Sequence, residues 1–165
     1  MLKRVARFFP LVIACTVLAL TGCGGGGPTP SEAQKAAPTE PTHQDFGEFE
    51  VHYNALRTDQ LAPDVARAYA IERSANRVML NVSLLRKNPD GTTTPVDGNV
   101  TASAYNLNGQ MKDLQMRRIT EGASFYFIGE VGISGAEILV FDINAAPNGQ
   151  QSKYSVQFKR EFFAD

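Results

Sequence analysis

Apolar and polar residues alternate one by one along most of the chain between residues 46 and 165. Successive side chains of a β-strand point to opposite faces, so this period of two predicts strands with one buried face. In the first stretch Phe49, Val51 and Tyr53 share one face, with polar residues between them. Seven stretches are predicted to be strands: 46–55, 76–87, 99–107, 110–119, 124–130, 136–145 and 154–163.

Turn-forming residues separate these strands. Asn88-Pro89-Asp90-Gly91 and Pro147-Asn148-Gly149 are typical of turns, and Asn108-Gly109 predicts a type I′ hairpin. The stretch 76–87 is apolar on both faces, which favours a central position in its sheet. Together these patterns predict an all-β fold, an immunoglobulin-like antiparallel β-sandwich of about seven strands. A small barrel is the alternative.

Residues 57–75 break the alternation. Pro63 followed by Asp64 is typical of a helix start, so residues 63–69 are predicted to form one or two helical turns. This gives one short helical crossover between the first two strands. One side of the helix carries apolar residues four positions apart, which we expect to close an end of the sandwich: Leu61, Val65 and Tyr69.

The N-terminus has the features of an export signal. Lys3, Arg4 and Arg7 precede an apolar run at 8–20, which is shorter than the roughly 20 residues that a membrane-spanning helix needs. The run ends in Leu20-Thr21-Gly22-Cys23, which resembles the lipobox of bacterial lipoproteins. The resemblance implies that residues 1–22 are removed and that Cys23 is acylated with fatty-acid chains such as palmitate.

The segment that follows Cys23 predicts a tether. Residues 23–45 are rich in Gly and Pro and have almost no large apolar side chains, so we expect them to be disordered, with His43 solvated. Residues 46–165 are then the β-sandwich domain. Gly24 follows the cysteine, where lipoproteins kept in the inner membrane have Asp. The resemblance therefore implies the periplasmic face of the outer membrane.

Composition narrows the possible functions. Sixteen Lys and Arg balance seventeen Asp and Glu, so no basic face for nucleic acid is expected. Once the signal is removed and Cys23 is acylated, no free thiol remains for a disulfide, a zinc ligand or a nucleophile. No phosphate-binding loop or dinucleotide motif occurs. We therefore predict no cofactor and no catalysis.

Four short motifs resemble a family of exported proteobacterial proteins of unassigned function. They are H-Y-N-A at 52–55, L-x-P-x-V-A at 61–66, Y-x-I-x-R-S at 69–74 and L-N-V-S-L at 80–84. The resemblance implies a periplasmic all-β domain and supplies no reaction. Ala70 stands where the family pattern has Gly.

The densest polar group of the domain surrounds the crossover and gives the candidate binding residues: His52, Asn54, Arg57, Tyr69 and Arg73. They could form a pocket for an anionic ligand or for an envelope protein. Alternatively, the arginines bind Asp59, Asp64 and loop carbonyls, and Tyr69 belongs to the core.

The favoured function is a lipid-anchored binding or scaffolding module of the cell envelope. Two alternatives remain open. One is an envelope hydrolase that uses Glu48, Glu50 or His52. The other is a periplasmic copper-binding protein that uses methionines, of which Met79, Met111 and Met116 lie in the folded part.

Overall fold

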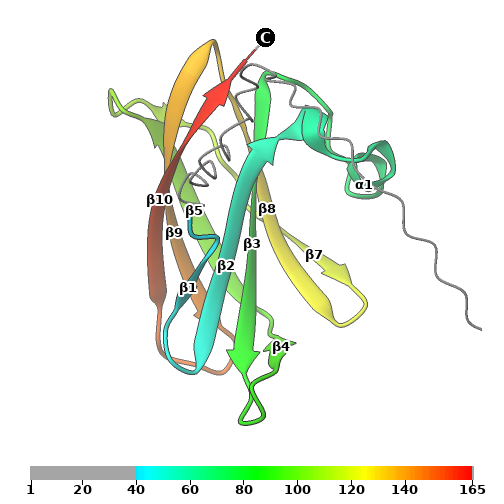
Figure 1. The fold of residues 1–165 in the computed structure, drawn as a ribbon, viewed down its shortest axis with the longest axis vertical. Coiled ribbons are helices and arrows are strands. Elements are labelled where there is room, and N and C mark those ends of the chain that lie inside the picture. The colour runs from blue at the N-terminus through cyan, green and yellow to red at the C-terminus, as the bar shows by residue number, and fades with distance from the viewer. Residues whose placement is uncertain (1–39, 165) are drawn as a thin grey trace, which may run out of the picture. The chain divides into compact units, whose positions relative to one another are not determined.

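A computed structural model describes residues 40–164, which form two antiparallel β-sheets and one short helix (Figure 1). The predicted signal peptide, Cys23 and most of the predicted tether lie outside the described residues. The last part of the tether segment does not: β1 (His43–Asp45) pairs with the following strand. The described fold thus includes residues that precede Phe46.

The first sheet has the order β1-β2-β3-β8-β7, and β4 (Thr93–Pro95) pairs with the end of β3. The strand β3 lies between β2 and β8, which confirms the central position predicted from its two apolar faces. The remaining strands of this sheet are β2 (Phe49–Arg57), β3 (Arg77–Lys87), β7 (Arg117–Glu121) and β8 (Ser124–Gly132).

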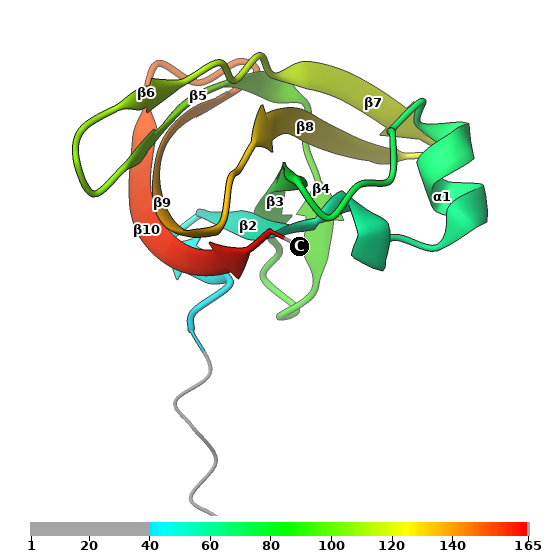
Figure 2. The same cartoon turned by 90° about the horizontal axis from the view of Figure 1, so that it is seen from above.

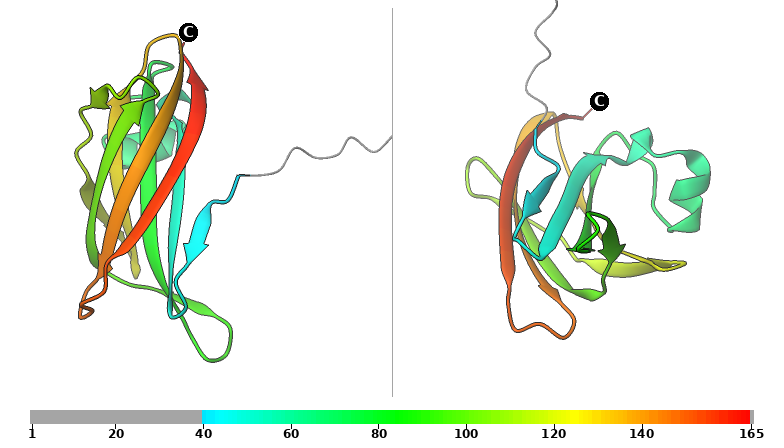
Figure 3. Two further views of the ribbon diagram at one scale, coloured as in Figure 1. Left: turned by 90° about the vertical axis from the view of Figure 1, so that its left-hand side faces the viewer. Right: turned by 60° about the horizontal axis from the view of Figure 1, so that its bottom comes forward.

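The second sheet has the order β10-β9-β5-β6 and packs against the first (Figures 2 and 3). The predicted sandwich is therefore confirmed, with ten strands in the described residues where about seven were expected. Seven of them have five or more residues, and the other three are the short β1, β4 and β6. The strands of this sheet are β5 (Gly98–Asn106), β6 (Met111–Lys112), β9 (Ala136–Pro147) and β10 (Tyr154–Phe163).

The main core lies between the sheets and follows the predicted alternation. Every second residue of β2 from Phe49 to Ala55 is buried, as are Val78, Leu80, Val82 and Leu84 of β3. Aromatic rings connect the sheets: Tyr53 stacks on Phe158, with ring centroids 4.7 Å apart. Burying this apolar surface is the main stabilising contribution to the fold.

The prediction of a single strand at 110–119 was wrong, because this stretch contributes to two strands in different sheets. Its start forms β6 beside β5, and its end forms β7 beside β8 in the other sheet. Between them Leu114 and Met116 pack over Gly129, where a Cβ atom would lie only 2.5 Å from Leu114 Cδ1. The bare backbone of Gly129 thus leaves room for the chain to cross between the sheets.

The turn predicted at Asn108-Gly109 has another conformation. A type I′ turn needs positive φ at both residues, but in the described chain only Gly109 of this pair has it. The Oδ1 atom of Asn106 accepts hydrogen bonds from the backbone of Asn108 and Gln110. The Asn106 side chain therefore stabilises a loop that is longer than the predicted two-residue turn.

The predicted crossover helix is confirmed as α1 (Pro63–Ala68), with Pro63 in its first turn, after the 3₁₀ turn η1 (Thr58–Gln60). The helix was expected to close an end of the sandwich, but it does not. It lies on the side of the first sheet away from β9 and β10 (Figure 2). There a second apolar cluster forms around Ala66, Ile71, Met79 and Ile128. Met79 points opposite to its neighbours in β3, so this cluster is on the outer face of the first sheet.

Candidate functional site

The outer face of the first sheet carries a polar pocket of about 300 Å³. The odd-numbered residues of β2 from Phe49 to Ala55 are buried in the core, so the even-numbered His52 and Asn54 face outward. In the pairing of β2 with β3, His52 lies opposite Ser83 and Asn54 lies opposite Asn81. The pocket is lined by Thr42, His52, Tyr53, Asn54, Asn81 and Ser83.

His52 is held by two neighbours. Its Nε2 atom lies 2.8 Å from Oε2 of Glu50 on the same face of β2. Its ring also stacks on His43 of β1, with centroids 5.1 Å apart. The pairing of β1 with β2 places these two histidines directly opposite each other. His43 thus lies beside the site in a strand, where a disordered tether was expected, and its side chain is exposed, as the prediction of a solvated residue requires.

Asn54 is tied to the second sheet. Nη1 of Arg160 on β10 donates hydrogen bonds to Oδ1 of Asn54 at 2.6 Å and to the carbonyl of Ala55. Nε of Arg160 also binds the carboxylate of Glu40. Arg160 therefore joins the edges of the two sheets beside the polar pocket. In the sequence it is the charged residue on the core-facing side of the last strand, which is the signal that could have identified it.

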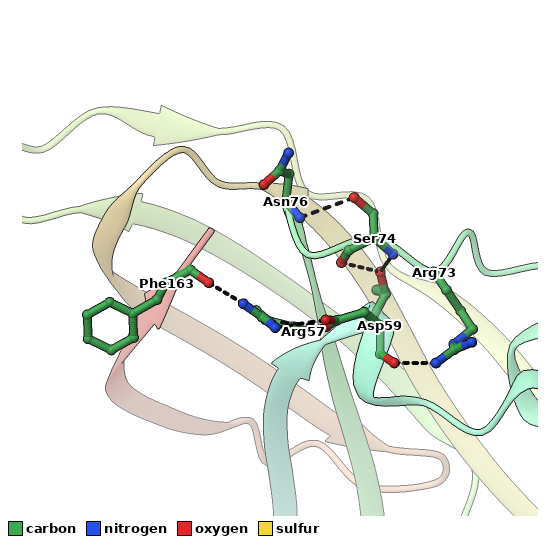
Figure 4. A network of polar contacts seen from close by, with 7 residues as sticks. Arg57, Asp59, Arg73, Ser74, Asn76 and Phe163 are labelled. Atoms are coloured by element: carbon green, nitrogen blue, oxygen red, sulfur yellow. Dashed lines mark hydrogen bonds and ion pairs between the residues drawn. The ribbon is translucent and has the colours of Figure 1, made fainter. Parts of the chain in front are cut away.

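Arg57 and Arg73 belong to a different cluster, at the end of β2 (Figure 4). Arg57 donates two hydrogen bonds to the carboxylate of Asp59, and a third to the carbonyl of Phe163. Arg73 donates to the backbone carbonyl of Asp59. The buried Thr58 hydroxyl completes the cluster by bonding to the backbone of Ser74. Both arginines bind groups of the fold itself, and neither lines the pocket that contains His52. Arg57 instead lines a second pocket, of about 430 Å³, together with Asn54 and Arg160.

Tyr69 belongs to neither the polar pocket nor the arginine cluster. It lines an apolar pocket of about 270 Å³ between the crossover and the sheet. Its hydroxyl donates to the Glu121 carboxylate at 2.7 Å. The lining residues come from β2, β3, β7, β8 and the crossover, and most are apolar: Leu56, Leu61, Val65, Tyr69, Ile71, Met79, Asn81, Ile119, Glu121, Tyr126 and Ile128.

Asn81 lines both the polar pocket and the apolar pocket. Its Oδ1 atom is buried and accepts no hydrogen bond from the described residues. Sequence reasoning missed Asn81 and its neighbour Ser83. The available signal was a pair of polar residues on the outward face of β3, between the apolar Met79 and Leu85.

The three methionines of the copper-binding alternative do not share a site. Met79 is buried in the cluster beneath α1, Met111 is exposed on β6, and Met116 packs over Gly129. Across residues 40–164, no three His, Cys, Asp or Glu side chains are grouped to hold a metal ion. Within the same residues, no helix is long and apolar enough to cross a membrane.

Comparison with known proteins gives a family and a fold. Residues 43–165 match a domain of unknown function, DUF4426. A DUF4426 family protein from Pseudomonas aeruginosa PAO1 has a crystal structure that superposes with a TM-score of 0.63 and 34% identity, over 74% of this chain and 94% of that one.

FetP from uropathogenic Escherichia coli strain F11 shares the fold at a TM-score of 0.52 and only 9% identity, over 73% of this chain and 92% of that one. No curated protein matches the sequence. The Pseudomonas relative and the match over residues 43–165 agree with each other, and the chain belongs to the DUF4426 family.

Proposed function

We propose that the protein is a lipid-anchored binding module of the bacterial envelope, which holds its ligand or partner on the outer face of the first sheet. The observation that carries this proposal is the position of Asn81, which lines both the polar and the apolar pocket. Its amide oxygen is buried and has no hydrogen-bond partner in the part of the chain that the structure describes. Buried polar atoms are nearly always hydrogen-bonded in folded proteins, so an unpartnered one at a pocket favours a binding role.

The anchoring part of the proposal rests on the N-terminal sequence. Leu20 to Cys23 match a lipobox, and Gly24 favours the outer membrane over the inner one. Two or more acyl chains on Cys23 would hold the domain stably at the membrane surface. The related fold of FetP comes from a protein expressed in the periplasm, which agrees with the same compartment.

Fractionation of cells tests the anchor. The full chain should label with palmitate and sediment with outer membranes, and a Cys23→Ser variant should lose the label. Labelling that persists in Cys23→Ser would disprove acylation at this residue. Sedimentation with inner membranes would disprove the predicted location.

Photo-crosslinking in living cells tests the binding face. A photoreactive residue at position 83 lies in the polar pocket, and one at position 101 is the matched control on the exposed face of the second sheet. We expect a discrete cross-linked product at 83 that is absent at 101. No product at 83, or the same products at both positions, would contradict the proposed face.

A second candidate function has one observation in its favour. The Glu50 carboxylate contacts His52, and Ser83 lies across from His52 on the next strand. A carboxylate, an imidazole and a hydroxyl are the groups of acyl-transfer catalysis. Hydrolysis of p-nitrophenyl acetate that disappears in both Glu50→Gln and Ser83→Ala would support a hydrolase. Turnover no faster than buffer would leave binding as the function.

A further inference from the structure

The apolar pocket is large enough for a ligand group. Its volume of about 270 Å³ exceeds the roughly 150 Å³ cavity that accommodates a benzene ring in another protein. Met79, Ile71 and Ile128 are almost fully buried, whereas Val65 of α1 is 37% exposed. The pocket therefore reaches solvent beside α1.

Asn81 is poorly suited to a purely structural role at this position. On one side its neighbour is Ile128 of β8, and on the other it is Asn54 of β2. The Oδ1 atom of Asn54 accepts a hydrogen bond from Arg160, and no described neighbour donates one to Oδ1 of Asn81. A leucine at position 81 would have a similar size and would bury no unpartnered atom. The amide thus costs stability in the free protein, a cost that a ligand can offset.

The chemistry of the site indicates which ligand would fit. A primary amide both accepts and donates hydrogen bonds in one plane, which complements another amide group. The χ2 torsion of Asn is broad, so the amide plane of Asn81 can rotate to meet such a group. Among residues 40–164, no Lys, Arg or His lines the apolar pocket, and the Glu121 carboxylate does, so a negatively charged ligand is disfavoured.

We propose that the apolar pocket binds a peptide-like ligand. Its branched aliphatic side chain fills the space beside Val65, and its neutral amide group hydrogen-bonds to Asn81. This inference rests on the proposed binding function and adds the class of ligand. The polar pocket next to Asn81 would take the continuation of the ligand, past His52 and Ser83.

Three small probes separate the two parts of this contact. N-acetylleucinamide has the side chain and the amide, N-acetylglycinamide lacks the side chain, and isoamyl acetate lacks the N–H donor. Binding is followed through the NMR methyl signals of Ile119 and Ile128, which line the pocket. We expect saturable shifts with N-acetylleucinamide, at an affinity at least threefold above that of either other probe.

Variants then assign the contact. Asn81→Leu should reduce the affinity for N-acetylleucinamide to that for isoamyl acetate, and the matched surface variant Asn99→Leu should leave it unchanged. Val65→Lys, at an exposed position, should abolish the shifts without affecting the fold. Circular dichroism checks that each variant is folded.

Equal affinity of wild type and Asn81→Leu would overturn the role of the amide. Absence of saturable shifts at Ile119 and Ile128 would overturn the pocket itself. Either result is distinguishable from failure of the proposed function, because cross-linking at position 83 reports on the face independently of these probes. Binding of the probes without any cross-linked product would instead contradict the wider function.

Discussion

The Tyr69 hydroxyl donates a hydrogen bond to Oε2 of Glu121, a residue 52 positions later in the chain. The carbonyl of Tyr69 accepts a second hydrogen bond, from Arg117 on the same strand, β7. The residue that follows α1 is thus held twice by β7, and Tyr69 and Glu121 both line the apolar pocket. The hydrogen bond to Glu121 raises the pKa of Tyr69, because ionised tyrosine would lose the donated proton beside a carboxylate.

Replacing Glu121 by glutamine should lower the pKa of Tyr69 toward its usual value of 10.0. The pKa in the folded state is raised, so this contribution to stability is present below about pH 10 and is lost as the pH rises through the folded-state pKa. The ring-carbon NMR signal of Tyr69, assigned with Tyr69→Phe, measures the pKa. An identical titration in wild type and Glu121→Gln would show that the hydrogen bond does not form in solution.

Replacing Ala70 by glycine should stabilise the protein. It has φ of +53°, and among the described non-glycine residues it alone has positive φ. The backbone of Ile71 bonds to Ala66 and that of Ala70 to Arg67, which is the Schellman ending of a helix. The left-handed conformation costs an alanine about 1 kcal/mol, so Ala70→Gly should raise the free energy of unfolding by about 0.5–1 kcal/mol.

Urea unfolding of wild type, Ala70→Gly and Ala70→Val measures this effect. The valine variant is the opposite control, because a β-branched side chain is less tolerant of positive φ. A glycine variant less stable than wild type would contradict the expected strain.

Glu137 should make the free energy of unfolding depend on pH in the acidic range. Burial favours a higher pKa, but hydrogen bonds from Lys112 and Asn106 outweigh it and hold the pKa of Glu137 below its usual 4.5. The lowered folded-state pKa means that this stabilisation is present above about pH 4.5 and is lost as the pH falls through the folded-state value. Wild type should therefore lose more unfolding free energy than Glu137→Gln between about pH 6 and pH 3. Parallel pH curves in urea titrations would refute this assignment.

Gly129 should not tolerate a methyl group. An added Cβ would lie 2.5 Å from Leu114 Cδ1, 2.8 Å from Met116 Sδ and 3.0 Å from the backbone oxygen of Gln115. Overpacking of this kind costs about 1–3 kcal/mol, so Gly129→Ala should lower the melting temperature by several degrees. Gly132→Ala on the same strand is the matched control, because its Cβ would meet nothing within 4 Å. Equal stability of the two variants would mean that the crossing segment is loosely packed.

Much of the fold could be predicted because burial imposes a period of two on strands. The buried faces of β2 and β3 and the extent of α1 agree with the pattern of apolar residues. The pattern failed at 113–116, where contacts with Gly129 decide the path of the chain. Such contacts join residues far apart in the sequence, so local alternation carries no information about them.

The candidate site was harder to predict for the same reason. His52 and Asn54 share one pocket, and Asn54 and Arg57 share another. Arg73 and Tyr69 are held elsewhere, by the backbone of Asp59 and by the Glu121 carboxylate. Because the five predicted residues are close in the sequence, they were expected to form one cluster. The bend after β2 separates Arg73 and Tyr69 from His52 and Asn54. Asn81 becomes a candidate only once its oxygen is known to lack a hydrogen-bond partner among the described residues. Only the packed structure can show this.

Arg160 has a consequence for how copies of the molecule behave at high concentration. An open sheet edge invites a second molecule to add a strand, and such edges seed aggregation. The carbonyl of Ala55 on the edge of β2 is already satisfied by Arg160. An incoming strand would have to displace a guanidinium that Asn54 and Glu40 hold in place. Domains crowded together would thereby be protected from polymerising through this edge.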